Sequence, residues 1–490
     1  MKMSISKFYE NREVFLTGVT GSLGKVLLEK LLRSCNTRKI YILIRSKKGM
    51  PAEERKTELF RSKIFENVLL TNPDIYNKVE CIEGNLTREN LGISFSNMNL
   101  ITKNVSVVFH LAASVKFNEP FRDAFVNNVE TTKNVVEVCR QMKNLLVLIY
   151  TSTAFSFFNK EKVDEKIYTM YRTYKEFNNI ANLENNASVE ITDESLLENR
   201  PNTYTLTKAI TENYLNEFCR DLPIVIVRPS IVGSTWKEPF AGWNDMNSAA
   251  DYVVATGLKG ILRSMLCDKG KISDFIPSDA VINLMLSAAW RKSITPHRRE
   301  DEILVYNCTS GSINPFTWQQ FFKCVSTHYW KYPPENTFLY PTNIPKKNYY
   351  WNQVCLVMQH RLPAMLADVF RVAIGKKPKM MTVYNKLHKT MKIIEPFTTR
   401  EWTFPAGNVG ELLKMMSTQD KQNFDFDISK LNWDQYMKHY FLGIRRFVLK
   451  EDDSTIPRCR KIILTKYYSI LLAKTGLLFG FLYILTFLLF

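Results

Sequence analysis

The sequence predicts an α/β fold: a doubly wound parallel sheet, then a mostly helical C-terminal domain and a hydrophobic C-terminal segment. Three observations predict it. Apolar runs rich in Val and Ile recur along the first half, helical stretches such as residues 121–141 lie between them, and the last sixteen residues carry no charge. Strands buried on both faces of a parallel sheet have continuous apolar runs, and their alternation with helices indicates doubly wound topology.

The predicted strands follow one another at the intervals that such a sheet requires, at residues 14–16, 39–44, 79–85, 106–113, 145–153 and 223–230. The chain has 490 residues, 45% of them hydrophobic and 23% charged. At roughly 100–200 residues per domain, that length predicts two or three domains. We expect a doubly wound domain with insertions at 1–330, a helical domain at 331–455 and a membrane anchor at 467–490.

Composition narrows the classes of partner. The formal net charge is +18, with Lys and Arg spread along the whole length and no nucleic-acid-binding motif. We therefore expect no nucleic-acid partner, and interpret the charge either as a solvated basic surface or as a surface for membrane and phosphate-bearing ligands. The nine cysteines include no CxxC pair, which favours reduced cytosolic thiols. The six histidines lack metal-ligand spacing, so no metal site is expected.

A glycine-rich turn follows the first strand and precedes the helical pattern KVLLEKLLRS. Gly18 permits a tight turn, Gly21 lets the backbone approach a pyrophosphate, and Gly24 allows close packing of helix on strand. The helix N-terminus then offers free N–H groups and a positive dipole end to phosphates. The turn therefore predicts a dinucleotide site of the Rossmann type, formed by Thr17, Gly18, Thr20, Gly21, Ser22, Leu23 and Gly24.

The second predicted strand ends about where this fold places the residue that recognises the ribose. NAD-binding proteins usually have Asp or Glu there, whereas this chain continues with Arg45-Ser46-Lys47-Lys48. A guanidinium at Arg45 can grip a 2′-phosphate through two hydrogen bonds, so the sequence favours NADPH over NADH. The alternative is a solvated basic loop.

Tyr204 and Lys208 lie four residues apart in a predicted helix and therefore share one face. A nearby ammonium is expected to lower the pKa of the phenol and so suit it to donate a proton to a developing alkoxide. Thr153 or Ser152, at the end of the fifth strand, can polarise a substrate carbonyl there. The alternative is that these hydroxyls merely cap the strand end.

The motifs TGVTGSLG, HLAASVKF, YTSTAF, YTLTK and VRPSIVG, in this order, resemble the extended short-chain dehydrogenases. Within that superfamily the chain resembles the alcohol-forming fatty acyl-CoA reductases over essentially its whole length. The segments that carry this resemblance include GNLTRENLGIS (84–94), EPFAGWNDM (238–246), HRLPAMLADVFRVAIGKKPKM (360–380) and the run 424–451.

The resemblance implies further site residues. Thr153, Tyr204 and Lys208 would form the catalytic set, with Asn128, or its neighbour Asn127, holding a proton-relay water through its backbone. Additional cofactor contacts would come from Tyr204 and Lys208 themselves and from Asn85, Leu86, His110, Ala112, Ala113, Pro229 and Ser230. Asn85 stands where relatives usually have Asp near the adenine, so that contact differs from the family pattern.

The reaction that the resemblance implies takes a long-chain or very-long-chain acyl-CoA to a primary alcohol and CoA. It consumes two NADPH and passes through a bound aldehyde, in the service of lipid synthesis. A long acyl chain needs an apolar tunnel. We expect it in residues 235–450, which are rich in aromatic residues and Met, contain helical runs such as LPAMLADVFRVAIG and would cover the carboxyl edge of the sheet, and we single out no tunnel residue.

Other functions remain open at this point. An extended dehydrogenase or epimerase acting on sterols, flavonoids or nucleotide sugars would share residues 14–230 but would leave the C-terminal half without a purpose. A non-enzymatic NADP(H)-binding sensor would have no need of Thr153, Tyr204 and Lys208. An enzyme that stops at the aldehyde is a third possibility.

The C-terminal segment 475–490 reads TGLLFGFLYILTFLLF. Sixteen helical residues span about 24 Å, and the hydrocarbon core measures roughly 30 Å. Lys474 can snorkel and Tyr467 and Tyr468 can lie at the interface, which extends the span. We expect contact with membrane lipid, by a single span or a hairpin, with the catalytic domain facing the cytosol. The endoplasmic reticulum is expected before the peroxisome or lipid droplet, and a homodimer is possible.

Overall fold

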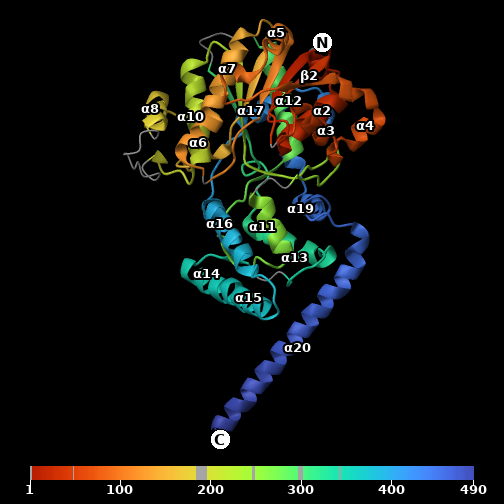
Figure 1. Cartoon of the computed structure of the whole chain (residues 1–490), viewed down its shortest axis with the longest axis vertical. Helices are drawn as coiled ribbons and strands as arrows, with labels where there is room; N and C mark the ends of the chain where they lie inside the picture. The colour runs from red at the N-terminus through yellow and green to blue at the C-terminus, as the bar shows by residue number, and fades with distance from the viewer. Residues whose placement is uncertain are drawn as a thin grey trace. The chain divides into compact units, whose positions relative to one another are not determined.

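The computed structural model describes residues 3–47, 49–117, 119–183, 196–245, 249–295, 302–340 and 344–489, without the side chains of 481–485 and 487–489. The chain forms two compact units, each assembled from three stretches of sequence (Figure 1). The first unit contains Met1–Trp243, Ile272–Phe316 and Glu401–Leu431. The second contains Asn244–Lys271, Thr317–Arg400 and Asn432–Phe490.

The first unit is built on a seven-stranded parallel sheet in the order β10-β6-β5-β4-β1-β2-β3. The order reverses between β1 and β4, which confirms the predicted doubly wound fold. Six strands match the sequence prediction and β10 was not anticipated. The strands are β1 (Glu13–Thr17), β2 (Lys39–Ile44), β3 (Val79–Glu83), β4 (Val105–His110), β5 (Val147–Thr151), β6 (Ile224–Pro229) and β10 (Leu304–Cys308).

Helices cover both faces of this sheet (Figure 1), because right-handed crossovers on either side of the reversal point place their helices on opposite faces. Helix α12 packs on β5, β6 and α2, whereas α7 packs on β4. The helices of this unit are α1 (Ile5–Tyr9), α2 (Ser22–Ser34), α3 (Ala52–Phe60), α4 (Glu66–Thr71), α5 (Phe95–Asn104), α6 (Phe121–Phe125), α7 (Thr131–Gln141), α8 (Tyr174–Leu183), α10 (Thr203–Phe218), α12 (Ser278–Ile294), α17 (Gly407–Met415) and α18 (Thr418–Asn423). The short strands β7 (Ile231–Gly233) and β9 (Phe275–Pro277) pair in parallel beside them.

The second unit is mainly helical, as the sequence predicted for the C-terminal part. Helix α13 packs on α19, and α16 packs on α11 and α15. Buried Asp251 on α11 accepts hydrogen bonds from the Tyr440 hydroxyl (2.6 Å) and the Asn244 amide (2.7 Å). The elements are α11 (Ala249–Leu258), β8 (Met265–Leu266), α13 (Trp318–Lys331), β11 (Pro345–Lys346), α14 (Tyr349–Leu356), α15 (Leu362–Ala373), α16 (Met380–Thr399), α19 (Trp433–Gly443) and α20 (Ile456–Leu489).

Helix α20 ends the chain and is largely exposed. Its base is fixed to the second unit, because the Lys466 ammonium donates to the Thr337 carbonyl (2.7 Å) and the Tyr467 ring contacts Trp330 and Tyr340. The stretch Asp453–Gly480 is, by length and composition, long and apolar enough to cross a membrane.

Candidate active site

The predicted site residues gather at the carboxyl edge of the sheet, where parallel α/β sheets bind ligands at the reversal of strand order. Strand β1 ends at Thr17, β4 at His110, β5 at Thr151 and β6 at Pro229. The glycine turn, the HLAA segment and the YTST segment therefore follow neighbouring strands and meet at one edge.

The glycine turn makes two close backbone approaches that exclude any larger residue. Gly18 has φ +79°, and a Cβ there would lie 2.5 Å from the Ala112 nitrogen. A Cβ at Gly24 would lie 2.2 Å from the Gly18 carbonyl oxygen, so this glycine brings α2 tightly against the turn.

The outer side of the same turn fits a dinucleotide pyrophosphate. A Cβ at Gly21 would meet only the Gly18 carbonyl oxygen within 4 Å, at 3.3 Å, so packing constrains Gly21 less than it constrains Gly18 and Gly24. Helix α2 begins at Ser22 with no side-chain cap. Its first-turn N–H groups, including that of Leu23, can therefore bind an anion. In the turn before the helix, Val19 is buried and Thr20 is exposed.

The end of β2 presents basic side chains, as the sequence predicted. The acidic residue Glu83 lies beside them, and the sequence analysis did not anticipate it. Arg45, Ser46 and Lys47 are exposed, and the Arg55 guanidinium donates to the Arg45 carbonyl. The Ser46 hydroxyl donates to Glu83, the last residue of the neighbouring strand β3. Within the described part of the chain, no ion pair engages the Arg45 guanidinium.

The loop after β3 is internally bonded. The Asn85 side-chain oxygen accepts from the Thr87 N–H (3.2 Å) and hydroxyl (3.0 Å). The Leu86 carbonyl accepts from the Asn134 amide of α7 (2.8 Å), which fixes the loop to the helix. The Asn85 side chain is thus directed into its own loop, and its contact with the adenine stays a prediction.

His110 connects the glycine turn to the helix that follows β4. Burial lowers the pKa of its imidazole to about 3, so the ring is neutral. Its Nε2 lies 3.0 Å from the Thr132 hydroxyl, which itself donates to the Asn128 carbonyl (2.7 Å). Because the Thr132 hydroxyl proton is used in that bond, its oxygen accepts from the ring, and the ring proton is assigned to Nε2. The unprotonated Nδ1 then accepts from the Thr17 hydroxyl at 2.6 Å. His110 is thus a neutral spacer that holds the glycine turn in place.

Asn128 lies in a π-helical turn, Val126–Glu130, between α6 and α7. Turns of this kind interrupt helices frequently at functional sites. Its side chain accepts from the Ser114 N–H (2.7 Å) and donates to the Ser114 carbonyl and the Thr207 hydroxyl. The structure therefore brings Asn128 against Thr207, between Tyr204 and Lys208 in the sequence, whereas Asn127 pairs with Glu119.

Tyr204 and Lys208 occupy the first turns of α10, as predicted, but their titration differs from the expectation. Burial raises the pKa of the Tyr204 phenol and lowers that of the Lys208 amine to about 7. The Lys208 ammonium donates to the Thr151 carbonyl (2.6 Å) and lies 4.7 Å from the centre of the Tyr150 ring. It is thus directed at the end of β5, and it does not lower the pKa of Tyr204 in the way that the sequence suggested.

Thr153 follows β5 in a buried loop, and its hydroxyl accepts from the Phe155 N–H (3.3 Å) and approaches the Pro229 carbonyl (3.5 Å). The following turn, Ala154–Phe157, packs against α10. Ser230 continues from β6 with its N–H bonded to the Cys308 carbonyl (3.1 Å). Thr153, Pro229 and α10 are thereby brought together, whereas Ala112 and Ala113 lie partly exposed after β4.

A buried ion pair that the sequence analysis missed supports this loop. Glu212 accepts from Ser152 and Ser156, the hydroxyls on either side of Thr153, and from the Arg228 guanidinium. Both charged groups are fully buried. Glu212 follows Lys208 by one helical turn, so its spacing on the catalytic face was the available signal.

Two family models, both described as male sterility protein, match residues 16–285 and 359–451, and the first is an NAD-binding model. Fatty acyl-CoA reductase 1 from Mus musculus is 38% identical, over 94% of this chain and 89% of that protein. The Homo sapiens form is 37% identical over the same shares, and fatty acyl-CoA reductase 2 from Mus musculus is 37% identical over 93% and 88%.

Two solved structures share the fold. The terminal R domain from the myxalamid PKS-NRPS biosynthetic pathway superposes with a TM-score of 0.57 and 18% identity, over 89% of this chain and 90% of that one. A reductase domain of a nonribosomal peptide synthetase from Mycobacterium tuberculosis gives 0.58 and 15%, over 90% and 92%.

Proposed function

The chain belongs to the fatty acyl-CoA reductase family, and on that premise we propose that it reduces long-chain or very-long-chain acyl-CoA to a primary alcohol, with NADPH as reductant. One observation supports this most: Thr153, Lys208 and the glycine turn gather at the carboxyl edge of one parallel sheet. Each alcohol formed would consume two NADPH and two protons and release one CoA thiol.

In the first reduction, the thioester carbonyl accepts hydrogen bonds from the hydroxyls of Thr153 and Tyr204. Donors fixed in a buried site stabilise the oxyanion that forms when the carbonyl carbon becomes tetrahedral. The carbon–sulfur bond then breaks, CoA leaves as its thiol, and an aldehyde remains bound. Tyr204 is suited to this role because burial raises the pKa of its phenol and keeps it protonated.

In the second reduction, the same two hydroxyls bind the aldehyde oxygen and Tyr204 gives up its proton as the alkoxide forms. Lys208 would bind the nicotinamide ribose, and the Tyr204 phenolate that remains would then take up a proton from solvent. The Lys208 amine lies one helical turn from Tyr204, and burial lowers its pKa to about 7. Asn128 holds this end of α10 through Thr207.

The proposed cofactor is NADPH, bound at the glycine turn, and the reduced nicotinamide supplies the hydride. Arg45 would hold the 2′-phosphate, since its side chain is exposed at the end of β2 beside Arg55. Glu83 is the opposing feature, because a carboxylate there favours ribose hydroxyls. We expect Arg45→Ala to raise the KM for NADPH by about 10- to 100-fold, the loss of a charged hydrogen bond, and to leave the KM for NADH unchanged. An equal loss with both cofactors would rule out a 2′-phosphate contact.

The protein is proposed to be anchored in a membrane by its C-terminal helix. Residues 467–490 would insert into it, with Lys461 and Lys466 on the cytosolic side, because the helix α20 is long, apolar and exposed. The endoplasmic reticulum is the proposed compartment. Microscopy of the tagged full chain tests the compartment. Extraction of membranes with alkaline carbonate tests the insertion: the full chain should stay with the membrane, and retention of a chain without residues 467–490 would contradict insertion through this segment.

The experiment that tests the reaction uses membranes containing the chain, acyl-CoA substrates from C12 to C26, and NADPH or NADH. Wild type should form alcohol with NADPH, and Tyr204→Phe should form none. Tyr214→Phe on the same helix is the matched control and should retain activity. Aldehyde alone would restrict the chain to one reduction, and no product from folded, NADPH-binding protein would refute an acyl-CoA substrate.

A further inference from the structure

Residues 349–374 of the second unit expose a concentration of large apolar side chains. The segment consists of α14, a π-helical turn (Val357–Arg361) and α15. Among the described residues it contributes thirteen of the thirty exposed large apolar side chains. Six of them recur at every fourth position and so form one stripe, which we call the outer stripe: Tyr350, Val354, Met358, Leu362, Leu366 and Phe370.

The opposite side of the same helices carries polar residues, and these are bonded into the protein. The Asn352 side chain accepts from the Ser264 hydroxyl (2.8 Å), and His360 Nε2 accepts from the Arg263 N–H (2.9 Å). Asp368 accepts three backbone N–H groups at the start of α16, at 2.8–2.9 Å. All three polar residues are buried.

In this helix pair the exposed face is apolar and the buried face carries polar residues, which is the reverse of the pattern in a helix at a water surface. Such a helix turns its apolar stripe to the core and its polar residues to solvent. Here Tyr350 is 80% exposed and Leu366 62%, whereas Asp368 is 7% exposed. Contiguous apolar surface of this kind is rare on proteins surrounded by water and marks a contact with another apolar medium.

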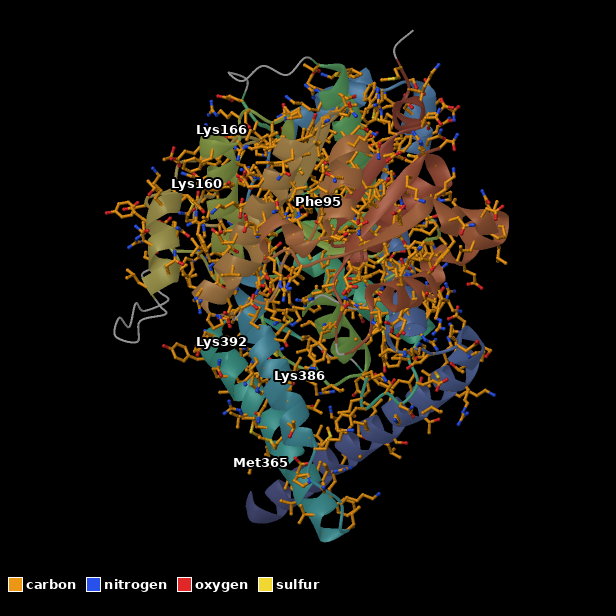
Figure 2. The ribbon with its side chains drawn as sticks, turned by 45° about the horizontal axis from the view of Figure 1, so that its top comes forward. Phe95, Lys160, Lys166, Met365, Lys386 and Lys392 are labelled. Atoms are coloured by element: carbon orange, nitrogen blue, oxygen red, sulfur yellow. The ribbon has the colours of Figure 1, made fainter. Side chains whose placement is uncertain are left out.

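Charge identifies that medium. From residue 346 to residue 392 the chain has ten Lys or Arg and a single acid, Asp368, whose carboxylate is turned inward. Arg361, Lys376 and Lys377 are exposed beside the outer stripe. Figure 2 shows Met365 on α15, with Lys386 and Lys392 on the neighbouring α16. Apolar side chains bordered by cations match acyl chains bordered by anionic headgroups.

We propose that α14 and α15 lie in the surface of an anionic membrane, with the outer stripe among the acyl chains and the flanking cations at the headgroups. Trp351 and Tyr349 at the start of α14 have the aromatic character that favours the interface. The same unit carries α20, so both elements meet one bilayer. Leu366, Val369 and Phe370 of α15 are exposed, so this part of the helical run is open to such a contact.

The test uses the full chain in vesicles of phosphatidylcholine and phosphatidylserine in a three-to-one mixture. The environment-sensitive dye NBD is attached to a new cysteine in Leu366→Cys, in Leu70→Cys or in Leu472→Cys. Leu70 is the matched control, an apolar residue of the first unit that is 76% exposed. Leu472, also 76% exposed, reports on α20. Doxyl-labelled lipid then quenches any dye among the acyl chains, and the readout does not require catalysis.

We expect blue-shifted emission and doxyl quenching at 366 and 472 and neither at 70. Replacing phosphatidylserine by phosphatidylcholine should weaken the quenching at 366 more than at 472. Quenching at 366 should also fall when Met365 and Phe370 are changed to Glu. An absence of doxyl quenching at 366 would overturn the proposal, whatever occurs at 472. Protection of 366 from aqueous iodide without doxyl quenching would assign the outer stripe to a second copy of the chain instead.

Discussion

Replacing Glu212 by Gln should both destabilise the first unit and slow the reaction. The Glu212 carboxylate accepts four hydrogen bonds, two from the Arg228 guanidinium and one each from Ser152 and Ser156. Glutamine keeps one acceptor oxygen, but its amide NH2 group would face groups that are themselves donors, namely Arg228 or the two serine hydroxyls. It also leaves the Arg228 cation buried without a counter-charge.

The magnitude follows from this burial. Removing one partner of a buried ion pair costs about 3–5 kcal/mol of the free energy of unfolding. Ser152 and Ser156 lie on either side of Thr153, so losing their common acceptor frees the loop that places the Thr153 hydroxyl. A misplacement of about 1 Å at a reacting centre can lower kcat on the order of 100-fold. The KM for acyl-CoA should change little, because no part of this pair is proposed to bind the substrate.

Urea titration monitored by tryptophan fluorescence, together with alcohol formation, measures both effects. Glu137→Gln is the matched control, because Glu137 forms a 2.6 Å ion pair with Arg140 that is partly exposed. Exposed pairs contribute about 0–1 kcal/mol. The double variant Glu212→Leu with Arg228→Met should recover much of the stability but not kcat. The reasoning is refuted if Glu212→Gln is as stable as the control, or if it keeps wild-type kcat.

Three further predictions concern the glycine turn and the buried bases. Gly24→Ala should weaken NADPH binding and destabilise the protein by about 1–3 kcal/mol, because its Cβ would overlap a backbone oxygen, whereas Gly410→Ala on α17 meets nothing within 4 Å and should be neutral or stabilising in thermal unfolding. Burial lowers the pKa of His110 to about 3, so below pH 6.5 the unfolded chain binds more protons than the native chain and the free energy of unfolding falls as the pH drops. In urea titrations between pH 7 and pH 5, the free energy of unfolding of His110→Gln should therefore fall by about 2 kcal/mol less than that of wild type. Burial lowers the pKa of Lys208 to about 7, so below that pH the native state carries the free-energy cost of a buried charge. Lys208→Met should therefore abolish alcohol formation and yet unfold at a higher urea concentration than wild type at pH 6, and this stability advantage should disappear toward pH 10.5. A variant less stable than wild type at pH 6 would contradict this.

The sheet was predictable because five of its six anticipated strands are largely apolar runs that are buried almost throughout; the sixth, the edge strand β3, has the sequence VECIE and is only partly buried. Strand β10 was missed: its residues, LVYNC, contain a buried Asn307 whose amide bonds to the carbonyls of Val163 and Pro405. Those partners come from distant segments, so a single sequence gives no sign that an Asn can sit inside a strand there. The return of Glu401–Leu431 to the first unit is likewise decided by long-range packing.

The site was predictable to the extent that it depends on local motifs. The glycine turn, Thr153, Tyr204 and Lys208 lie where spacing placed them. Charge states could not be foreseen, because burial and not the neighbouring residue decides the pKa values of Tyr204 and Lys208. The exposure of α15 was also hidden, since an apolar stripe on a helix has the same sequence pattern whether it faces a core or a lipid.

The measurement that tests the central proposal most directly is the deuterium content of the product. Membranes containing the chain would receive palmitoyl-CoA and NADPH carrying deuterium at both C4 positions of the nicotinamide. Because both hydrides are proposed to come from NADPH, the alcohol should contain two deuterium atoms at C1. Alcohol with one deuterium or none, or aldehyde as the only product, would contradict the account.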